Sequence, residues 1–209
     1  MTDAHLAALA DRIAALPSGT RRLVAVVGPP GAGKSTLAEA LLAALTDRGV
    51  TAAILPMDGF HYDDAILDAR GLRPRKGAPE TFDAAGLGHL LDRLRANAEA
   101  EIAVPVFDRA LEISRNAARM IPREVGTVIV EGNYLLLDRP GWRDLRNRFD
   151  LTVALDVDEA ELRRRLTDRW RGHGIPEADI PAKVEANDLP NGRAVLAESL
   201  PADVTIPYQ

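Results

Sequence analysis

Residues 28–36 have the types and spacing of a phosphate-binding loop. Their first eight positions read Gly-Pro-Pro-Gly-Ala-Gly-Lys-Ser, which matches G-x-x-x-x-G-K-[ST] at every fixed position. Glycines let the backbone wind so tightly that successive N–H groups face one phosphate, and the following helix adds its positive N-terminal end. The pattern predicts that the nucleotide phosphates are held by Gly28, Pro29, Pro30, Gly31, Ala32, Gly33, Lys34, Ser35 and Thr36.

Three side chains of this loop would carry different parts of the chemistry. Lys34 would reach the β and γ phosphates, Ser35 would ligate Mg²⁺, and Thr36 would contact phosphate where the helix opens. A glycine turn that joins a strand to a helix and binds nothing is the alternative. The flanking patterns favour phosphate binding, because the β-branched run 23–27 predicts a buried strand and the leucines of 37–45 predict a helix.

Asp58 is the candidate for the side chain that orients an acceptor hydroxyl. It follows the apolar run 50–55, which predicts a second strand, and ligands of open parallel sheets bind at the carboxyl ends of strands. Phosphoryl transfer passes through a loose transition state, so a weak base is sufficient. The alternative is a turn aspartate, since Asp-Gly favours turns.

Glu131 closes a third predicted core strand, 127–130. It would touch Mg²⁺ through water or hold the acceptor, unless it only marks the exit of the strand to solvent. A single acidic residue here favours neither an oligomeric ATPase, which would want an acidic pair, nor a GTPase, for which the chain lacks the guanine-reading Asn-Lys-x-Asp.

Composition sets further limits. The chain of 209 residues is 46% hydrophobic, which is enough for a full core, and its net charge of −5 argues against a general nucleic-acid binder. It contains no cysteine, which fits a cytoplasmic protein without disulfides or a thiolate zinc site. The opening residues lack the basic region of a signal peptide, and no apolar run reaches the ~18 residues of a membrane span.

Strand and helix patterns alternate along nearly the whole chain. This alternation predicts right-handed βαβ units and a parallel sheet covered on both faces. A small irregular hairpin is expected within 111–121, a loop without apolar period over 70–83, and a capping box at Asp158–Glu161. Further strands are predicted at 102–107, 151–155 and 203–206, and helices at 3–16, 34–48, 63–69, 83–97, 142–149, 159–171, 180–187 and 195–200.

Six motifs, in this order, resemble those of the P-loop small-molecule kinases grouped with uridine kinase, phosphoribulokinase and bacterial pantothenate kinase. They are GPPGAGKST, PMDGFH, RKGAPETFD, VPVFDR, VIVEGNYLLLD and NDLPN, and together they cover about residues 22–191. More narrowly, the chain resembles the branch known as nucleoside or nucleotide kinases and as fructose-transport-system kinases (fructokinases).

The resemblance implies a fold and an activity. The fold is α/β, a three-layer P-loop NTPase fold of nucleoside/nucleotide-kinase type, with a five-stranded parallel sheet and helices on both faces. One kinase domain would span 1–209, with an N-terminal helix at 3–16 and a small lid around 162–175. ATP and Mg²⁺ are the implied cofactors, and the γ-phosphoryl would pass to a hydroxyl of a small metabolite. Members of this family often form dimers or tetramers, so a homodimer is one assembly that the resemblance allows.

Roles for individual residues follow from the same resemblance. Lys34 and Asp58 would be catalytic, together with Arg165 and Arg169 as lid arginines, although charged helix faces are usually just solvated. Ser35 and Glu131 would hold the metal. Asn187, Asp188 and Asn191 would lie near the adenine unless they cap a helix. The acceptor would be bound by His61, Tyr62, Arg75, Lys76, Arg109, Glu131 and Asn133.

The likeness does not fix the acceptor. Uridine kinases carry a tyrosine and a His-Ser-Arg run where this chain has Phe107 and Glu112–Arg115, and pantothenate kinases are substantially longer. A sugar such as fructose, a nucleoside and a pantothenate-like compound therefore all stay open. The alternative function is a nucleotide-dependent switch that has no metabolite acceptor.

Overall fold

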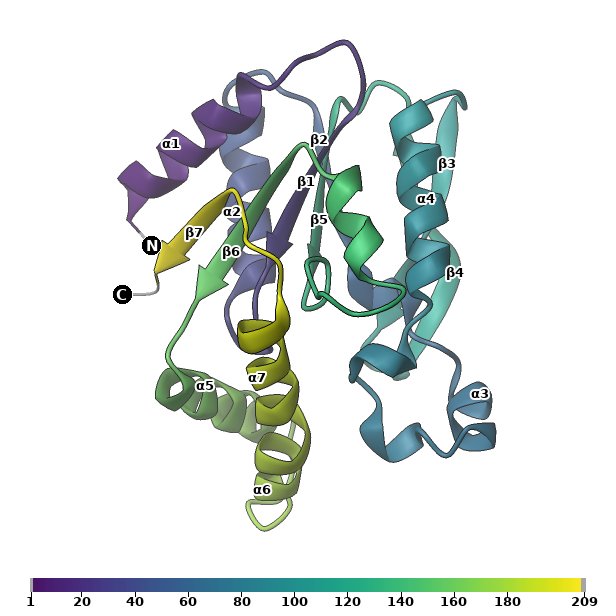
Figure 1. Ribbon diagram of the computed structural model, residues 1–209, viewed down its shortest axis with the longest axis vertical. Helices are drawn as coiled ribbons and strands as arrows, with labels where there is room; N and C mark the ends of the chain where they lie inside the picture. Colours follow the sequence, from purple (N-terminus) through teal and green to yellow (C-terminus); the bar gives the residue numbers. More distant parts are fainter. Residues whose placement is uncertain (1, 208–209) are drawn as a thin grey trace.

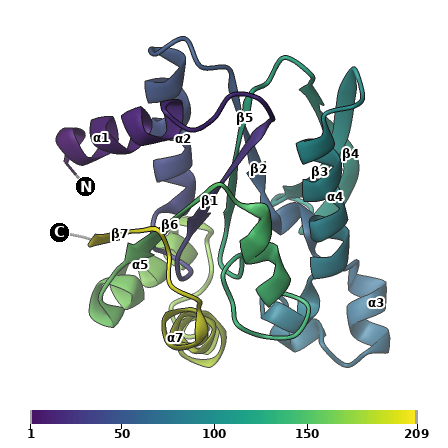
Figure 2. The same ribbon diagram turned by 45° about the horizontal axis from the view of Figure 1, so that its top comes forward.

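A five-stranded parallel sheet forms the centre of the computed structural model, which describes residues 2–207. The strand order is β2-β5-β1-β6-β7, and every neighbouring pair is parallel. Helices cover both faces of the sheet (Figures 1 and 2), so the predicted fold class is confirmed. The strands are β1 (Arg22–Val27), β2 (Ala52–Pro56), β5 (Thr127–Gly132), β6 (Leu151–Asp156) and β7 (Val204–Pro207).

Alternate side chains of β1 enter two separate cores. Leu23, Ala25 and Val27 pack on the side of the helix of residues 84–96 and the hairpin of residues 101–122, whereas Val24 and Val26 pack on the side of the helices of residues 3–14 and 34–46. All five are buried, as expected for a central strand of a parallel sheet that is covered on both faces. The helices are α1 (Asp3–Ala14), α2 (Lys34–Thr46), α3 (Asp64–Ala69), α4 (Ala84–Ala96), α5 (Glu159–Gly172), α6 (Ile180–Lys183) and α7 (Leu189–Glu198).

The hairpin is longer and more regular than predicted. Strands β3 (Glu101–Asp108) and β4 (Ile113–Pro122) pair antiparallel, with one shift in register between Val104 and Val106. The sequence favoured an irregular hairpin because β4 is mostly exposed and lacks alternating apolar residues. The partner strand and the packing of Ile102, Val104 and Ile121 into the core supply the order that the sequence pattern does not show.

The C-terminal helical region also differs from the prediction. A break was expected after Asn187, yet α6 continues through a π-helical turn, Val184–Asp188, directly into α7. Pro190 cannot donate a backbone hydrogen bond, and a wider turn before it accommodates that loss without ending the helix. At the start of α5 the predicted capping box does not form, because Asp158 makes no side-chain capping bond and Glu161 instead binds Arg164 and Arg165.

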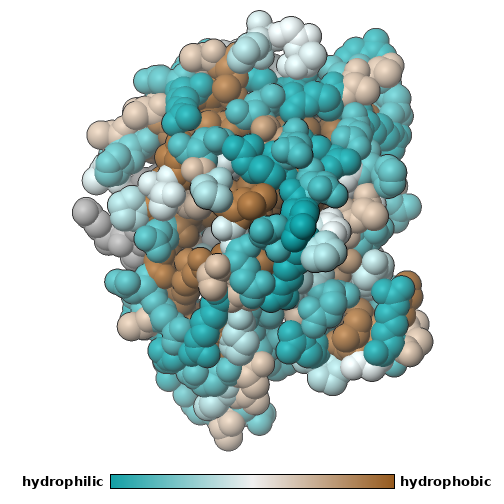
Figure 3. All heavy atoms as spheres, in the orientation of Figure 1, coloured by the Kyte–Doolittle hydropathy of each residue, from teal (hydrophilic) through white to brown (hydrophobic). Residues whose placement is uncertain are grey.

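Short 3-10 turns fill the segments expected as loops or a helix. They are Met57–Phe60, Arg73–Arg75, Pro79–Thr81 and Arg143–Arg148. Below the carboxyl ends of the strands, α5, α6 and α7 form one lobe, and α3 with the two turns of residues 73–81 forms another (Figure 1). Side chains on the visible face of both lobes are mostly hydrophilic (Figure 3). No described helix is long and apolar enough to cross a membrane.

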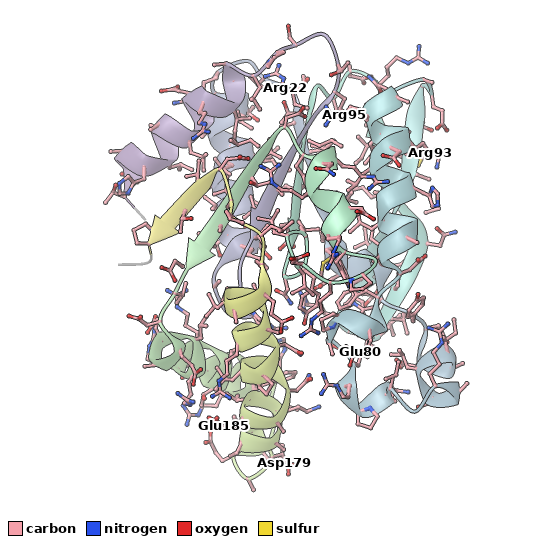
Figure 4. The ribbon with its side chains drawn as sticks, viewed as in Figure 1. Arg22, Glu80, Arg93, Arg95, Asp179 and Glu185 are labelled. Carbon is pink, nitrogen blue, oxygen red and sulfur yellow. The ribbon has the colours of Figure 1, made fainter. Side chains whose placement is uncertain are left out.

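Arg21 joins the opposite end of the sheet to the hairpin. Its guanidinium is buried and donates to the carbonyls of Val125 and Pro122 at 2.8 and 2.7 Å, with longer bonds to Leu94 and Arg123. Burial lowers its pKa from the usual value. Arg22 and Arg95, labelled in Figure 4, lie at this same end, where β1 begins.

Replacing Arg21 with alanine is expected to lower the free energy of unfolding by about 3 kcal/mol, because several buried carbonyls lose their donor together. Urea denaturation followed by circular dichroism measures this difference. Arg12→Ala, an exposed arginine in α1, is the matched control and should change stability little. A loss below about 1 kcal/mol for Arg21→Ala would contradict the assigned role.

Candidate functional site

A cleft of 360 Å³ opens at the carboxyl ends of the parallel strands. The phosphate-binding loop supplies one wall, the ends of β2 and β5 supply the floor, and α5 supplies two arginines. This is the place where an open α/β sheet binds its ligands. The cleft is lined by Pro30, Gly31, Gly33, Lys34, Ser35, Thr36, Asp58, Arg109, Glu131, Gly132, Asn133, Arg165 and Arg169.

The phosphate-binding loop has the backbone that its glycines predict. Gly31 and Gly33 have φ angles of 81° and 92°, a left-handed conformation that residues with a Cβ seldom adopt. Gly33 is the N-cap of α2, whose first residue is Lys34. The loop therefore delivers its backbone N–H groups and the positive end of a 13-residue helix to the cleft.

Lys34 is a half-buried cation between two carboxylates. Its Nζ donates to the Pro29 carbonyl at 3.0 Å, so the ammonium folds back over the loop. Burial lowers the pKa of Lys34 to about 8, while the charges of Glu131 and Asp58 act in the opposite direction. A desolvated ammonium with few competing partners is well placed to bind a polyphosphate.

Glu131 lies beside Ser35 at the end of β5. It is 9% exposed, and its burial raises the pKa of its carboxyl group, against the attraction of Lys34. The neighbouring Ser35 hydroxyl acts in the opposite direction and lowers the pKa of the Glu131 carboxyl group. The structure thus brings together the two oxygen donors that were predicted to hold the metal, and Glu131 is the carboxylate beside Ser35.

Asp58 stands at the other side of the cleft and is paired with an arginine. It is the second residue of the 3-10 turn after β2, and its Oδ2 accepts from Arg109 Nη2 at 2.9 Å. The side chains are 29% and 52% exposed, respectively. Arg109 comes from the turn of the hairpin, 51 residues further along the chain.

The two predicted lid arginines both reach the cleft, by different routes. Arg165 donates from Nη1 to the carbonyls of Gly31 and Ala32 at 3.2 and 3.3 Å and is held by Glu161 at 2.7 Å. Arg169 lies one turn further along α5, where its charge lowers the pKa of Lys34 and its guanidinium lies over the ring of Trp170. Helix α5 therefore contacts the phosphate-binding loop directly through Arg165.

His61 and Tyr62 do not line this cleft. Both line a second, wider groove of 520 Å³ between α4, the hairpin and the turn after β2. The His61 ring packs against Phe82 and Phe107, with centroids 3.9 and 4.8 Å apart, and its Nδ1 bonds to the Asp58 carbonyl at 2.9 Å. Burial lowers the pKa of His61, so this neighbour of Asp58 is held neutral. Its position supports the backbone of Asp58.

Arg75 and Lys76 are also absent from the lining of the phosphate cleft. Arg75 is half exposed and pairs with Glu80 at 3.0 Å. Lys76 is engaged with Asp64 at 2.7 Å and with the Glu112 carbonyl at 2.5 Å, so it ties α3 to the hairpin turn. These contacts of Lys76 join residues far apart in the sequence, and a loop that lacks a periodic apolar pattern gives no signal from which to predict them.

Asn187 lies against the loop of residues 73–81, and its place near the adenine stays a prediction. Its amide donates to the Lys76 carbonyl at 3.1 Å and accepts from Asn191 at 3.2 Å. The neighbouring Asp188 accepts from Trp170 Nε1 of α5 at 2.7 Å. Sequence analysis missed this connection, as it missed the Tyr134 hydroxyl, which donates to the Gly77 carbonyl at 2.7 Å.

The lowered pKa of Lys34 predicts that ATP binding weakens in alkaline solution. Its pKa lies near 8 instead of 10.5, so the charged form is present below about pH 8 and is lost as the pH rises through that value. The KM for ATP is expected to rise about tenfold per pH unit above that point. Steady-state kinetics between about pH 6 and 10 measure the profile.

Glu131→Gln supplies the control for this profile. The Glu131 charge raises the pKa of Lys34, so its removal should move the inflection to lower pH. An inflection that stays in place in Glu131→Gln would show that another group titrates.

Comparisons with known proteins agree with this geometry. A family model described as AAA ATPase domain matches residues 2–201. Among solved structures, the "putative fructose transport system kinase" from Silicibacter sp. TM1040 has a TM-score of 0.92 at 46% identity, covering 99% of this chain and 100% of that one. The Schizosaccharomyces pombe protein named "Putative uridine kinase C227.14" is 32% identical over 197 residues, 89% of this chain and 83% of that protein.

A pantothenate kinase from Streptomyces coelicolor is 32% identical over 163 residues, which is 74% of this chain. The chain spans only 49% of the length of that protein, in line with the expectation that pantothenate kinases are longer.

The fold and the phosphate-binding cleft define a P-loop ATP-binding enzyme, the class that the family model also describes. This class of protein is broader than the small-molecule kinases that the sequence motifs indicated. The kinase relatives narrow the assignment to that smaller group. The chain belongs to the P-loop small-molecule kinases of the uridine kinase, pantothenate kinase and phosphoribulokinase group, as its motifs predicted, and is an ATP-dependent phosphotransferase.

Proposed function

We propose that the protein uses Mg²⁺ and ATP to phosphorylate a hydroxyl group of a small metabolite. One observation carries the proposal: Lys34, the Ser35–Glu131 pair and Asp58 line one cleft at the carboxyl ends of the strands. The cleft thus combines groups suited to phosphate, to a hard cation and to an alcohol.

Ser35 and Glu131 are the proposed metal-holding residues. Mg²⁺ prefers oxygen ligands and is usually bound through one or two side chains together with substrate phosphates. A serine hydroxyl and a largely buried carboxylate that line the same cleft fit such a donor set. When bound, the ion would offset the negative charge of the phosphates during the transfer.

The chain's own residues would perform the positioning. The loop N–H groups and Lys34 hold the phosphates, and Arg165 and Arg169 approach from α5 to offset the charge that spreads over the transferring phosphoryl. Asp58 accepts a hydrogen bond from the acceptor hydroxyl and thereby orients the hydroxyl oxygen toward the γ phosphorus. The Asp58 carboxylate takes the proton of that hydroxyl late in the transfer.

The acceptor pocket is proposed to lie between Asp58, Arg109 and Asn133, all of which line the cleft. A sugar such as fructose, a nucleoside or a pantothenate-like compound would present a hydroxyl there. The relatives support each of these by name and disagree with one another. The homodimer admitted by the resemblance stays a prediction.

An acceptor screen tests the proposal. Coupled ADP release is measured with Mg²⁺ and ATP over sugars, sugar phosphates, hydroxy acids, nucleosides and pantothenate. The right acceptor should raise ADP release well above the rate with water alone. A nucleotide-dependent switch would instead hydrolyse ATP at a rate that no metabolite changes. That result would overturn the proposal that the cleft contains an acceptor site.

A further inference from the structure

We propose that Arg109 selects an acceptor that carries an anionic group, a carboxylate or a phosphate, in addition to the hydroxyl that becomes phosphorylated. The proposal rests on the kinase function above and narrows its substrate class. In the structure Arg109 pairs with Asp58, so the same arginine masks the proposed base until an acceptor arrives.

The pair occupies one of the two carboxylate oxygens of Asp58. Arg109 Nη2 lies 2.9 Å from Asp58 Oδ2, and both side chains line the 360 Å³ cleft that also contains Lys34. An alcohol that donates to Oδ2 would therefore have to displace the guanidinium. Because the Arg109 side chain is 52% exposed, it has room to turn aside.

The backbone that carries Arg109 is anchored on both sides. The Asp108 carboxylate accepts from the N–H groups of Ala110 and Leu111 at 3.1 Å each, which fixes the turn. Lys76 fastens the Glu112 carbonyl to α3 through Asp64. Release of Asp58 thus requires a rotation of the Arg109 side chain and no movement of the hairpin.

The other basic side chains of the neighbouring loop have different partners. Lys76 and Arg73 pair with Asp64 at 2.7 and 2.8 Å, and Arg75 pairs with Glu80 at 3.0 Å. Neither Asp64 nor Glu80 lines the phosphate cleft. Among these four cations, Arg109 is the one whose partner is the proposed base. Figure 4 shows Glu80 on its own lobe, apart from Asp179 and Glu185.

The exchange of partners discriminates between acceptors. A neutral acceptor takes Asp58 and leaves the guanidinium without an ion partner. An acceptor with a carboxylate or phosphate replaces that partner, and arginine binds both groups through two parallel hydrogen bonds. Since a half-exposed ion pair is weak, an incoming anion can displace it readily.

Matched acceptors test the selection. Coupled ADP release is compared for fructose and fructose 6-phosphate, glycerol and glycerate, and pantothenyl alcohol and pantothenate. In any pair of which at least one member is phosphorylated by the protein, we expect kcat/KM for the anionic member to exceed that for the neutral member by about tenfold or more. Arg109→Gln should abolish that preference through the KM for the acceptor and leave the KM for ATP unchanged.

Arg115→Gln is the control, because Arg115 lies on the same hairpin, is 59% exposed and pairs with Asp108 at 3.3 Å. It should keep the preference. Equal use of both members, or a change in Arg109→Gln confined to the KM for ATP, would overturn the selection and leave the kinase function standing. No response to any acceptor, with neutral and anionic compounds alike, would instead count against the kinase function itself.

A second measurement needs no acceptor. If Arg109 masks Asp58, Arg109→Gln should raise the hydrolysis of saturating ATP by water about twofold to fivefold, which is what an exposed ion pair is worth. The rise should vanish when Asp58→Asn is added to Arg109→Gln. Hydrolysis that is unchanged in Arg109→Gln would refute the masking.

Discussion

Replacing Lys34 with alanine is expected to lower kcat/KM for ATP about 10³-fold. The ammonium is half-buried, its Nζ lies 3.0 Å from the Pro29 carbonyl in the phosphate-binding loop, and its neighbours include Glu131 and Asp58. Without it, the Glu131 carboxylate would lose its neighbouring cation and would repel the phosphates. Coupled ADP release with the best acceptor measures the loss.

Lys183→Ala is the control for this substitution. Lys183 lies exposed on α6, with its ammonium 5.4 Å from the centre of the Trp170 ring. It removes the same charge from the chain without touching the phosphate cleft, so kcat/KM should change by less than about threefold. A loss below about tenfold in Lys34→Ala would show that the loop N–H groups and the arginines bind the phosphates without it.

Asp58→Asn is expected to lower kcat about 10²- to 10⁴-fold, the usual contribution of a general base, with little change in the KM for ATP. The amide keeps the shape of the side chain and cannot take the proton of the acceptor hydroxyl. Asp58 contacts Arg109 and does not contact the loop, so nucleotide binding should survive. Steady-state kinetics with both substrates varied separate the two parameters.

Asp68→Asn makes the same chemical change at an exposed aspartate that pairs with Arg73 at 3.3 Å, and it should retain full activity. Wild-type turnover in Asp58→Asn would disprove the base assignment and would direct attention to Glu131, the other carboxylate of the cleft.

The layered fold could be predicted because its signals are local. A β-branched run, a glycine loop and an amphipathic helix follow one another within residues 22–46. The same alternation of strand and helix recurs along the chain. The errors fell where partners decide the structure. The exposed strand β4 is ordered by β3, and the helix through Pro190 continues because a π-helical turn absorbs the missing donor.

The cleft could be predicted in part for the same reason. Residues that directly end a strand, such as Asp58 and Glu131, can be placed by the sheet rule alone. Side chains in aperiodic segments cannot, since their partners are distant in sequence. Lys76 binds Asp64 and the Glu112 carbonyl, and Arg109 binds a residue 51 positions away.

The π-helical turn links the two lobes below the sheet. Asn187 holds the carbonyl of Lys76 on one lobe, and its neighbour Asp188 holds the indole of Trp170 on the other. Because these two residues are adjacent in one turn, a displacement of α5 that carries Asp188 with it is expected to shift the carbonyl of Lys76 as well. If the nucleotide raises the affinity for the second substrate by some factor, thermodynamic reciprocity requires that the second substrate raise the affinity for the nucleotide by the same factor.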